Sequence, residues 1–102
     1  MMEDKKAYQE TMEARLSQLG ARIDELQAKV QQTRTDVQAD LNQQIEELKV
    51  KRDVTQQRLQ ELKASGGQAW KTLKSGFQSA WDKLSHAMEE AASKFDREQS
   101  QK

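Results

Sequence analysis

The residues that could do chemistry in this chain are few and poorly grouped. The 102-residue sequence has no cysteine and one histidine, His86, with Glu89 and Glu90 three and four residues further on. On a helix these carboxylates lie one turn from the imidazole, so a weak contact is possible. A metal site needs more ligands, and the Glu-x-x-His spacing of metal-binding helical bundles is absent. We therefore expect a solvated His86, no metal and no cofactor.

Other catalytic patterns are also missing. The sequence contains no Gly-rich phosphate loop and no nucleophile elbow. Catalysis also needs a concave, partly dry site, for which two or three thin helices leave little room. We expect no catalytic residue and no enzymatic activity.

The elements that would carry any site are helices. From Tyr8 to Leu62 the chain has no proline and one glycine, Gly20. Its apolar residues recur at steps of three and four, which places them on one stripe of a helix and predicts a coiled-coil seam for self-association. The seam consists of Tyr8, Met12, Leu16, Leu19, Ile23, Leu26, Val30, Val37, Leu41, Ile45, Leu48, Leu59 and Leu62.

Polar residues interrupt this seam at two places. Arg52 and Thr55 stand between Leu48 and Leu59, and we expect Arg52 to extend towards solvent. The segment 33–36 combines β-branched and N-cap-type residues, which could begin a new helix. Because it has neither glycine nor proline, the pattern favours one continuous helix over 1–64.

A glycine pair, Gly66 and Gly67, predicts a hinge at 65–67 and a second, amphipathic helix at 68–97, followed by a frayed tail at 98–102. The apolar face of the second helix repeats every eleven residues. Gly76, Ala80, Ala87 and Ala91 line one edge of this face, where another helix backbone could approach closely. The face consists of Trp70, Leu73, Phe77, Trp81, Leu84, Met88 and Phe95.

The two predicted helices differ in length. At about 1.5 Å per residue, the first would span about 95 Å and the second about 45 Å, so the seam from Tyr8 to Val30 would stand in water. We therefore predict an all-α helical hairpin that completes three-helix bundles in an antiparallel homodimer. Val50 and Val54, off the main stripe, suit a segment with two neighbours. The alternative is a monomeric three-helix bundle with a break near Thr35.

Composition limits the partners. Seventeen basic and seventeen acidic residues cancel, so no net field would attract nucleic acid. The N-terminus shows no secretory signal and no apolar run is long enough to span a membrane, so a cytoplasmic location is expected. The predicted partners are further copies of the chain and a helical protein, with a membrane surface as second choice.

The segment GGQAWKTLKSGFQSAWDKLSHAMEEAASKF, preceded by a helix that opens MEDKKAYQE, resembles a group of small bacterial coiled-coil-domain proteins. They share a Gly-Gly hinge followed by Ala-Trp repeats. That group has no assigned activity, so the resemblance implies a helical fold and no functional residue. The eleven-residue repeat is also loosely similar to that of apolipoproteins and stress-related amphipathic proteins.

Two functions follow as hypotheses. The first is a structural or interaction protein, a self-associating coiled-coil scaffold or adaptor. The second is a reversible binder of membrane or lipid interfaces through the face from Trp70 to Phe95, because tryptophans and an amphipathic helix suit an interface. The polar side of that helix mixes lysines with carboxylates, which favours the first hypothesis.

Overall fold

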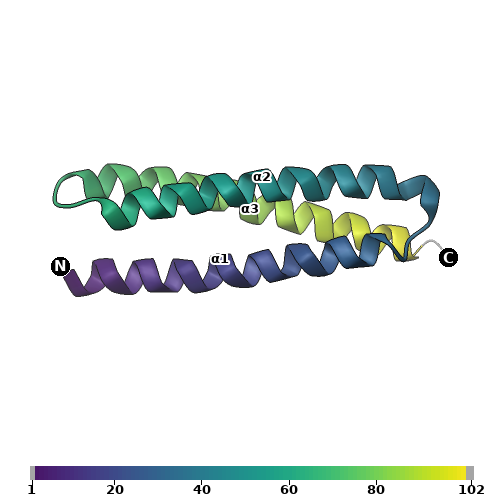
Figure 1. Ribbon diagram of the computed structural model, residues 1–102, viewed down its shortest axis with the longest axis horizontal. Coiled ribbons are helices and arrows are strands. Elements are labelled where there is room, and N and C mark those ends of the chain that lie inside the picture. Colours follow the sequence, from purple (N-terminus) through teal and green to yellow (C-terminus); the bar gives the residue numbers. More distant parts are fainter. Residues whose placement is uncertain (1, 101–102) are drawn as a thin grey trace.

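The computed structural model describes residues 2–100, of which 5–97 include side chains. It consists of three helices, α1 (Met2–Val30), α2 (Thr35–Ala64) and α3 (Ala69–Ser100). Successive helices run antiparallel along one long axis (Figure 1). The molecule extends over 54 × 18 × 16 Å. The all-α class expected from the helical spacing is confirmed.

The chain bends between Val30 and Thr35, so the prediction of one continuous helix over 1–64 is wrong. The break near Thr35 and the three helices of the alternative match the chain, whereas its monomeric state stays a prediction. Backbone N–H groups of residues 31–33 still donate to the carbonyls of residues 28–30, and then the chain reverses at Arg34. After this reversal α2 runs back antiparallel to α1 (Figure 1).

The second turn matches its sequence signal. α2 ends at Ala64, and the Ser65 hydroxyl and N–H both donate to the carbonyl of Leu62. Gly67 has φ +56°, a left-handed conformation that glycine adopts without a steric penalty. α3 begins at Ala69 and extends to Ser100, past the predicted end at residue 97, and residues 101–102 of the predicted tail lie outside the described residues.

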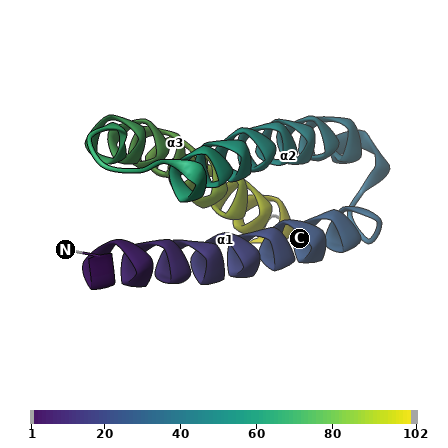
Figure 2. The ribbon, with the colours of Figure 1, turned by 60° about the vertical axis from the view of Figure 1, so that its left-hand side comes forward.

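The core lies along the axis of the bundle, where the apolar stripes of all three helices meet. Ile23, Leu41, Leu62, Phe77 and Leu84 are among its fully buried side chains. Figure 2 shows α1 along one side of the pair formed by α2 and α3. Three helices of about 30 residues each have similar lengths, near 45 Å. The length mismatch that predicted an exposed N-terminal half is therefore absent.

Candidate interaction surfaces

The predicted seam forms the core of a single chain. Eleven of its thirteen residues are buried, and the other two, Tyr8 and Val37, are partly buried against them. The expectation that the seam from Tyr8 to Val30 would need a second copy for cover is wrong, because the bend after Val30 lays α1 on α2 and α3. The buried seam residues are Met12, Leu16, Leu19, Ile23, Leu26, Val30, Leu41, Ile45, Leu48, Leu59 and Leu62.

The apolar face of α3 closes the same core. Phe77, Leu84, Met88 and Phe95 are buried, whereas Trp70, Leu73 and Trp81 are partly buried at its edge. The two tryptophans therefore keep part of their ring surface in contact with solvent.

An aromatic cluster joins the N-terminal part of α1 to the first turns of α3. The Tyr8 ring meets Trp70 and Phe77 edge to face, with centroids 6.0 and 6.2 Å away. Its hydroxyl donates to Gln78 Oε1 at 2.6 Å, and Lys74 Nζ lies 4.7 Å from the ring centroid. Such edge-to-face and cation–π contacts add to the gain from burial.

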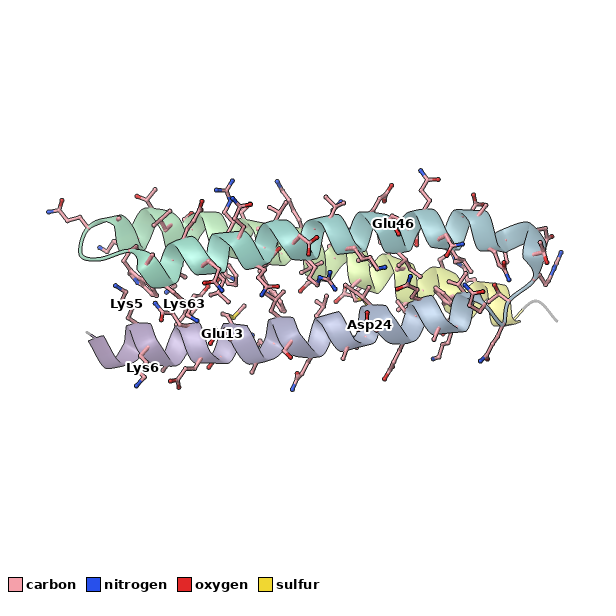
Figure 3. The ribbon with its side chains drawn as sticks, viewed as in Figure 1. Lys5, Lys6, Glu13, Asp24, Glu46 and Lys63 are labelled. Carbon is pink, nitrogen blue, oxygen red and sulfur yellow. The ribbon has the colours of Figure 1, made fainter. Side chains whose placement is uncertain are left out.

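Two lysines strengthen the same end of the bundle. Lys5 Nζ donates to the Ser65 carbonyl at 3.0 Å and lies 4.9 Å from the centroid of Trp70. Lys63 pairs with Glu13, across the α1–α2 contact. In Figure 3 Lys5 points towards α2, whereas its neighbour Lys6 points away from the bundle. We name the contacts of Lys5, Tyr8 and Glu13 with α2, α3 and their turn the N-terminal clasp.

Burial raises the pKa of the Tyr8 hydroxyl above its ordinary value, and the negative charge of Asp82 adds to this effect, while Arg15 opposes it. The neutral phenol is therefore the favoured form in the folded chain. It is also the form that donates to Gln78.

The α1–α2 turn has little chemistry of its own. Arg34 is the N-cap residue of α2, yet its side chain makes no capping hydrogen bond and instead pairs with Asp36. Gln38 Nε2 donates to the Thr33 carbonyl at 3.1 Å, and the Thr33 hydroxyl donates to the Val30 carbonyl at 2.7 Å. The α1–α2 turn contains no glycine, and none of its residues has a positive φ.

The polar residues inside the seam have different surroundings. Thr55 is fully buried, and its hydroxyl donates to Lys51 O at 2.7 Å and, more weakly, to Ala80 O of α3 at 3.4 Å. Arg52 carries its stem past Gly20, where an added Cβ would lie 3.7 Å from Arg52 Cδ, and its guanidinium reaches Asp53. The expected path of Arg52 towards the surface matches this arrangement.

His86 lies exposed on α3, where its Nε2 is 2.9 Å from Glu90 Oε1 one turn on. Glu89 is also exposed. In the part of the chain that the structure describes, no three His, Asp or Glu side chains converge as metal ligands would.

A groove with an apolar floor runs between the outer sides of α2 and α3, and we name it the α2–α3 groove. Its volume is about 320 Å³. Val54 at its edge is 43% exposed, and Val50, one turn earlier, is 61% exposed. The groove is lined by Lys51, Val54, Thr55, Arg58, Gly76, Ser79, Ala80 and Lys83.

Sequence reasoning identified only parts of these surfaces. The expectation that Val50 and Val54 would contact two neighbouring helices is not met in this chain, because both are exposed on α2. Gly76 and Ala80 were identified by their spacing, but the lysines of the N-terminal clasp were not. Ala80 contacts α2 as its position predicted, through the bond from Thr55. Gly76 has no such close neighbour on α2, because a Cβ added to it would meet no atom within 4 Å.

Comparison of the chain with protein-family models, with curated proteins and with solved structures gave no match. Among the helices of the described residues, none combines the length and the apolarity needed to cross a bilayer.

Proposed function

We propose that this chain is a non-enzymatic structural or interaction protein that associates with itself by exchanging α1 between two copies. In the exchanged form the α1–α2 turn becomes helical, and α1 and α2 join into one helix. The α1 of each chain then covers α2 and α3 of the other. Such an exchange preserves every core contact, because identical chains provide identical partners.

The observation that carries this proposal is the weak specification of the α1–α2 turn. The four residues 31–34 contain neither glycine nor proline, and no side chain caps the first turn of α2. The apolar spacing also continues across the turn, since Val37 follows Val30 by seven residues. A straight helix would therefore keep both halves of the seam on one face.

The experiment changes the N-cap and measures the molar mass by size-exclusion chromatography with light scattering. Arg34→Asn supplies a side chain that can cap α2 and favours the turn, whereas Arg34→Ala favours helix. A side-chain cap stabilises the closed turn by about 1 kcal/mol, and formation of an exchanged dimer removes the caps of two chains. The dimer dissociation constants of the two variants should therefore differ by roughly 30-fold.

The direction of the shift is as important as its size. The dimer, at twice 11.8 kDa, should be more populated in Arg34→Ala and less populated in Arg34→Asn. Asn42→Ala, an exposed change within α2, is the matched control and should leave the mass unchanged. A mass of 11.8 kDa for all variants up to millimolar concentration would contradict the proposal.

A second candidate function is reversible binding of lipid interfaces through α3. It is favoured by the partly exposed rings of Trp70 and Trp81 at the edge of a broad apolar face. Opening of the α1–α2 turn would remove α1 and expose the rest of that face. Vesicles of mixed anionic and zwitterionic lipid should then shift tryptophan emission to the blue, and an unchanged spectrum at a large lipid excess would exclude this function.

A further inference from the structure

The α2–α3 groove combines features that nothing inside the bundle explains. Among the side chains that the structure describes, Val50 and Val54 are the large apolar ones with the greatest exposure, and both lie on the outer side of α2. Facing the groove from α3, Gly76 has open space where a Cβ would be. Glycine inside a helix costs about 1 kcal/mol relative to alanine, and no neighbour within this chain requires its small size.

Open space above a helical glycine allows an external backbone or a large side chain to come close. Thr55 and Ala80 form the floor beside it, where the Thr55 hydroxyl joins the two helices. The groove is therefore open, and at its base lie Ala80 and the fully buried Thr55, where a weak hydrogen bond links α2 to α3. These properties suit the apolar stripe of one further helix, as in helix-in-groove recognition.

The rim of the groove carries positive charge. Lys51 and Arg58 stand on the α2 side and Lys83 on the α3 side, and no described carboxylate lines the groove. Arg58 pairs with Glu61, while neither lysine has an ion pair in the described part of the chain. Two free ammonium groups on opposite sides would complement carboxylates that flank an apolar stripe.

We propose that the α2–α3 groove binds an amphipathic helix of a partner protein whose apolar stripe is flanked by Asp or Glu. One large apolar side chain of that helix lies over Gly76, between Val54 and Ala80. Its flanking carboxylates approach Lys51 and Lys83. Both walls of the groove belong to α2 and α3, so the surface is the same in a closed bundle and in an exchanged dimer, and this proposal does not depend on helix exchange.

The test uses two fluorescein-labelled synthetic helical peptides with the same stripe of Leu and Ala. One carries Glu at the flanking positions and the other carries Lys. Fluorescence anisotropy with the full chain should show binding of the Glu peptide and at least about tenfold weaker binding of the Lys peptide, because the rim attracts one and repels the other. Equal binding of both peptides, or no binding of the Glu peptide at millimolar protein, would overturn the proposal.

Three variants locate the binding. Gly76→Leu fills the groove and should weaken binding of the Glu peptide at least about tenfold, whereas its matched control Gly76→Ala should change it less than about threefold. The double variant Lys51→Glu, Lys83→Glu should reverse the preference between the two peptides. All three positions are at the surface, and circular dichroism checks that the helices persist.

A lipid surface is the competing occupant of a basic, partly apolar face. Vesicles with anionic lipid, added in place of the peptides, distinguish the two. The surface is a membrane site, and the helix proposal is wrong, if three results occur together. The vesicles bind the chain and displace the Glu peptide, and the double variant Lys51→Glu, Lys83→Glu no longer binds the vesicles. In addition, Gly76→Leu leaves binding of the Glu peptide unchanged.

Discussion

Tyr8 of α1 meets Trp70 of α3 edge to face, with ring centroids 6.0 Å apart, although 62 residues separate them in sequence. This contact lies at the end of the bundle opposite the α1–α2 turn, where Lys5 also reaches the Ser65 carbonyl. The turn and the N-terminal clasp therefore hold α1 at its two ends. Release of α1, whether for exchange or for lipid binding, requires the clasp to open.

The clasp predicts a coupling between two aromatic residues. Tyr8→Leu and Trp70→Leu should each lower the free energy of unfolding, and the double variant should lose about 0.5–1.5 kcal/mol less than the sum of the two. Urea unfolding followed by circular dichroism measures each term. The control is the pair Tyr8→Leu and Phe95→Leu, because Phe95 lies at the far end of α3. The losses in free energy of unfolding from these two changes should be additive.

Tyr8 also predicts a dependence on alkaline pH. Its pKa is raised in the folded chain, so the folded state holds the phenol proton more tightly than the unfolded state does. Stability should be unaffected below the ordinary tyrosine pKa, about 10, and should fall as the pH rises from there towards the folded pKa.

Lysines titrate in the same range, so the measurement compares the native chain with Tyr8→Phe. The difference between their free energies of unfolding should be constant from pH 7 to about 9.5 and should change in favour of Tyr8→Phe above about pH 10. A difference that stays flat to pH 11.5 would show that the phenol does not discriminate between the two states.

The α2–α3 turn predicts unequal effects of two neighbouring glycines. Gly67→Ala should lower the free energy of unfolding by about 1–2 kcal/mol, because φ +56° brings a Cβ close to the carbonyl oxygen of the same chain. Gly66→Ala meets no atom within 4 Å and has no positive φ, so it should be close to neutral. Thermal unfolding of both variants checks this order.

The core predicts a large loss for one aromatic residue of α3. Phe77 is fully buried and contacts Tyr8, so Phe77→Ala should cost about 3–5 kcal/mol. Leu73→Ala, on a partly buried position of the same helix, should cost clearly less. Denaturant unfolding would contradict this description of the core if the two losses were equal.

Much of the fold could be predicted from the spacing of apolar residues. The stripe from Met12 to Leu62 and the face around Phe77 and Leu84 form the observed core, since helical periodicity alone decides which side chains share a face. The Gly67 turn was also predictable, because a left-handed residue after a helix is usually glycine.

The bend at residues 31–34 could not be decided in the same way. Thr33, Thr35 and Asp36 were visible as residues that can begin a helix, yet α2 begins after Arg34 without a side-chain cap. Residues 31–34 contain neither glycine nor proline, which would favour a turn over a helix. The bend is favoured by the burial of α1 against α2 and α3, a long-range effect that local patterns do not contain. The contacts of the N-terminal clasp form only because of the same bend. The sequence pattern therefore could not show that its lysines contact α2 and α3.

The most direct test of helix exchange is a distance between α1 and α2 within one chain. The chain has no cysteine, so Gln18→Cys, Gln57→Cys, both at exposed positions, can carry two spin labels for pulsed electron paramagnetic resonance in an excess of unlabelled chain. In the closed bundle the labels lie across its narrow dimension, whereas a continuous helix separates residues 18 and 57 by about 59 Å. We expect the short distance at low concentration and a second population near the long distance as concentration rises; the short distance alone at every concentration would contradict helix exchange.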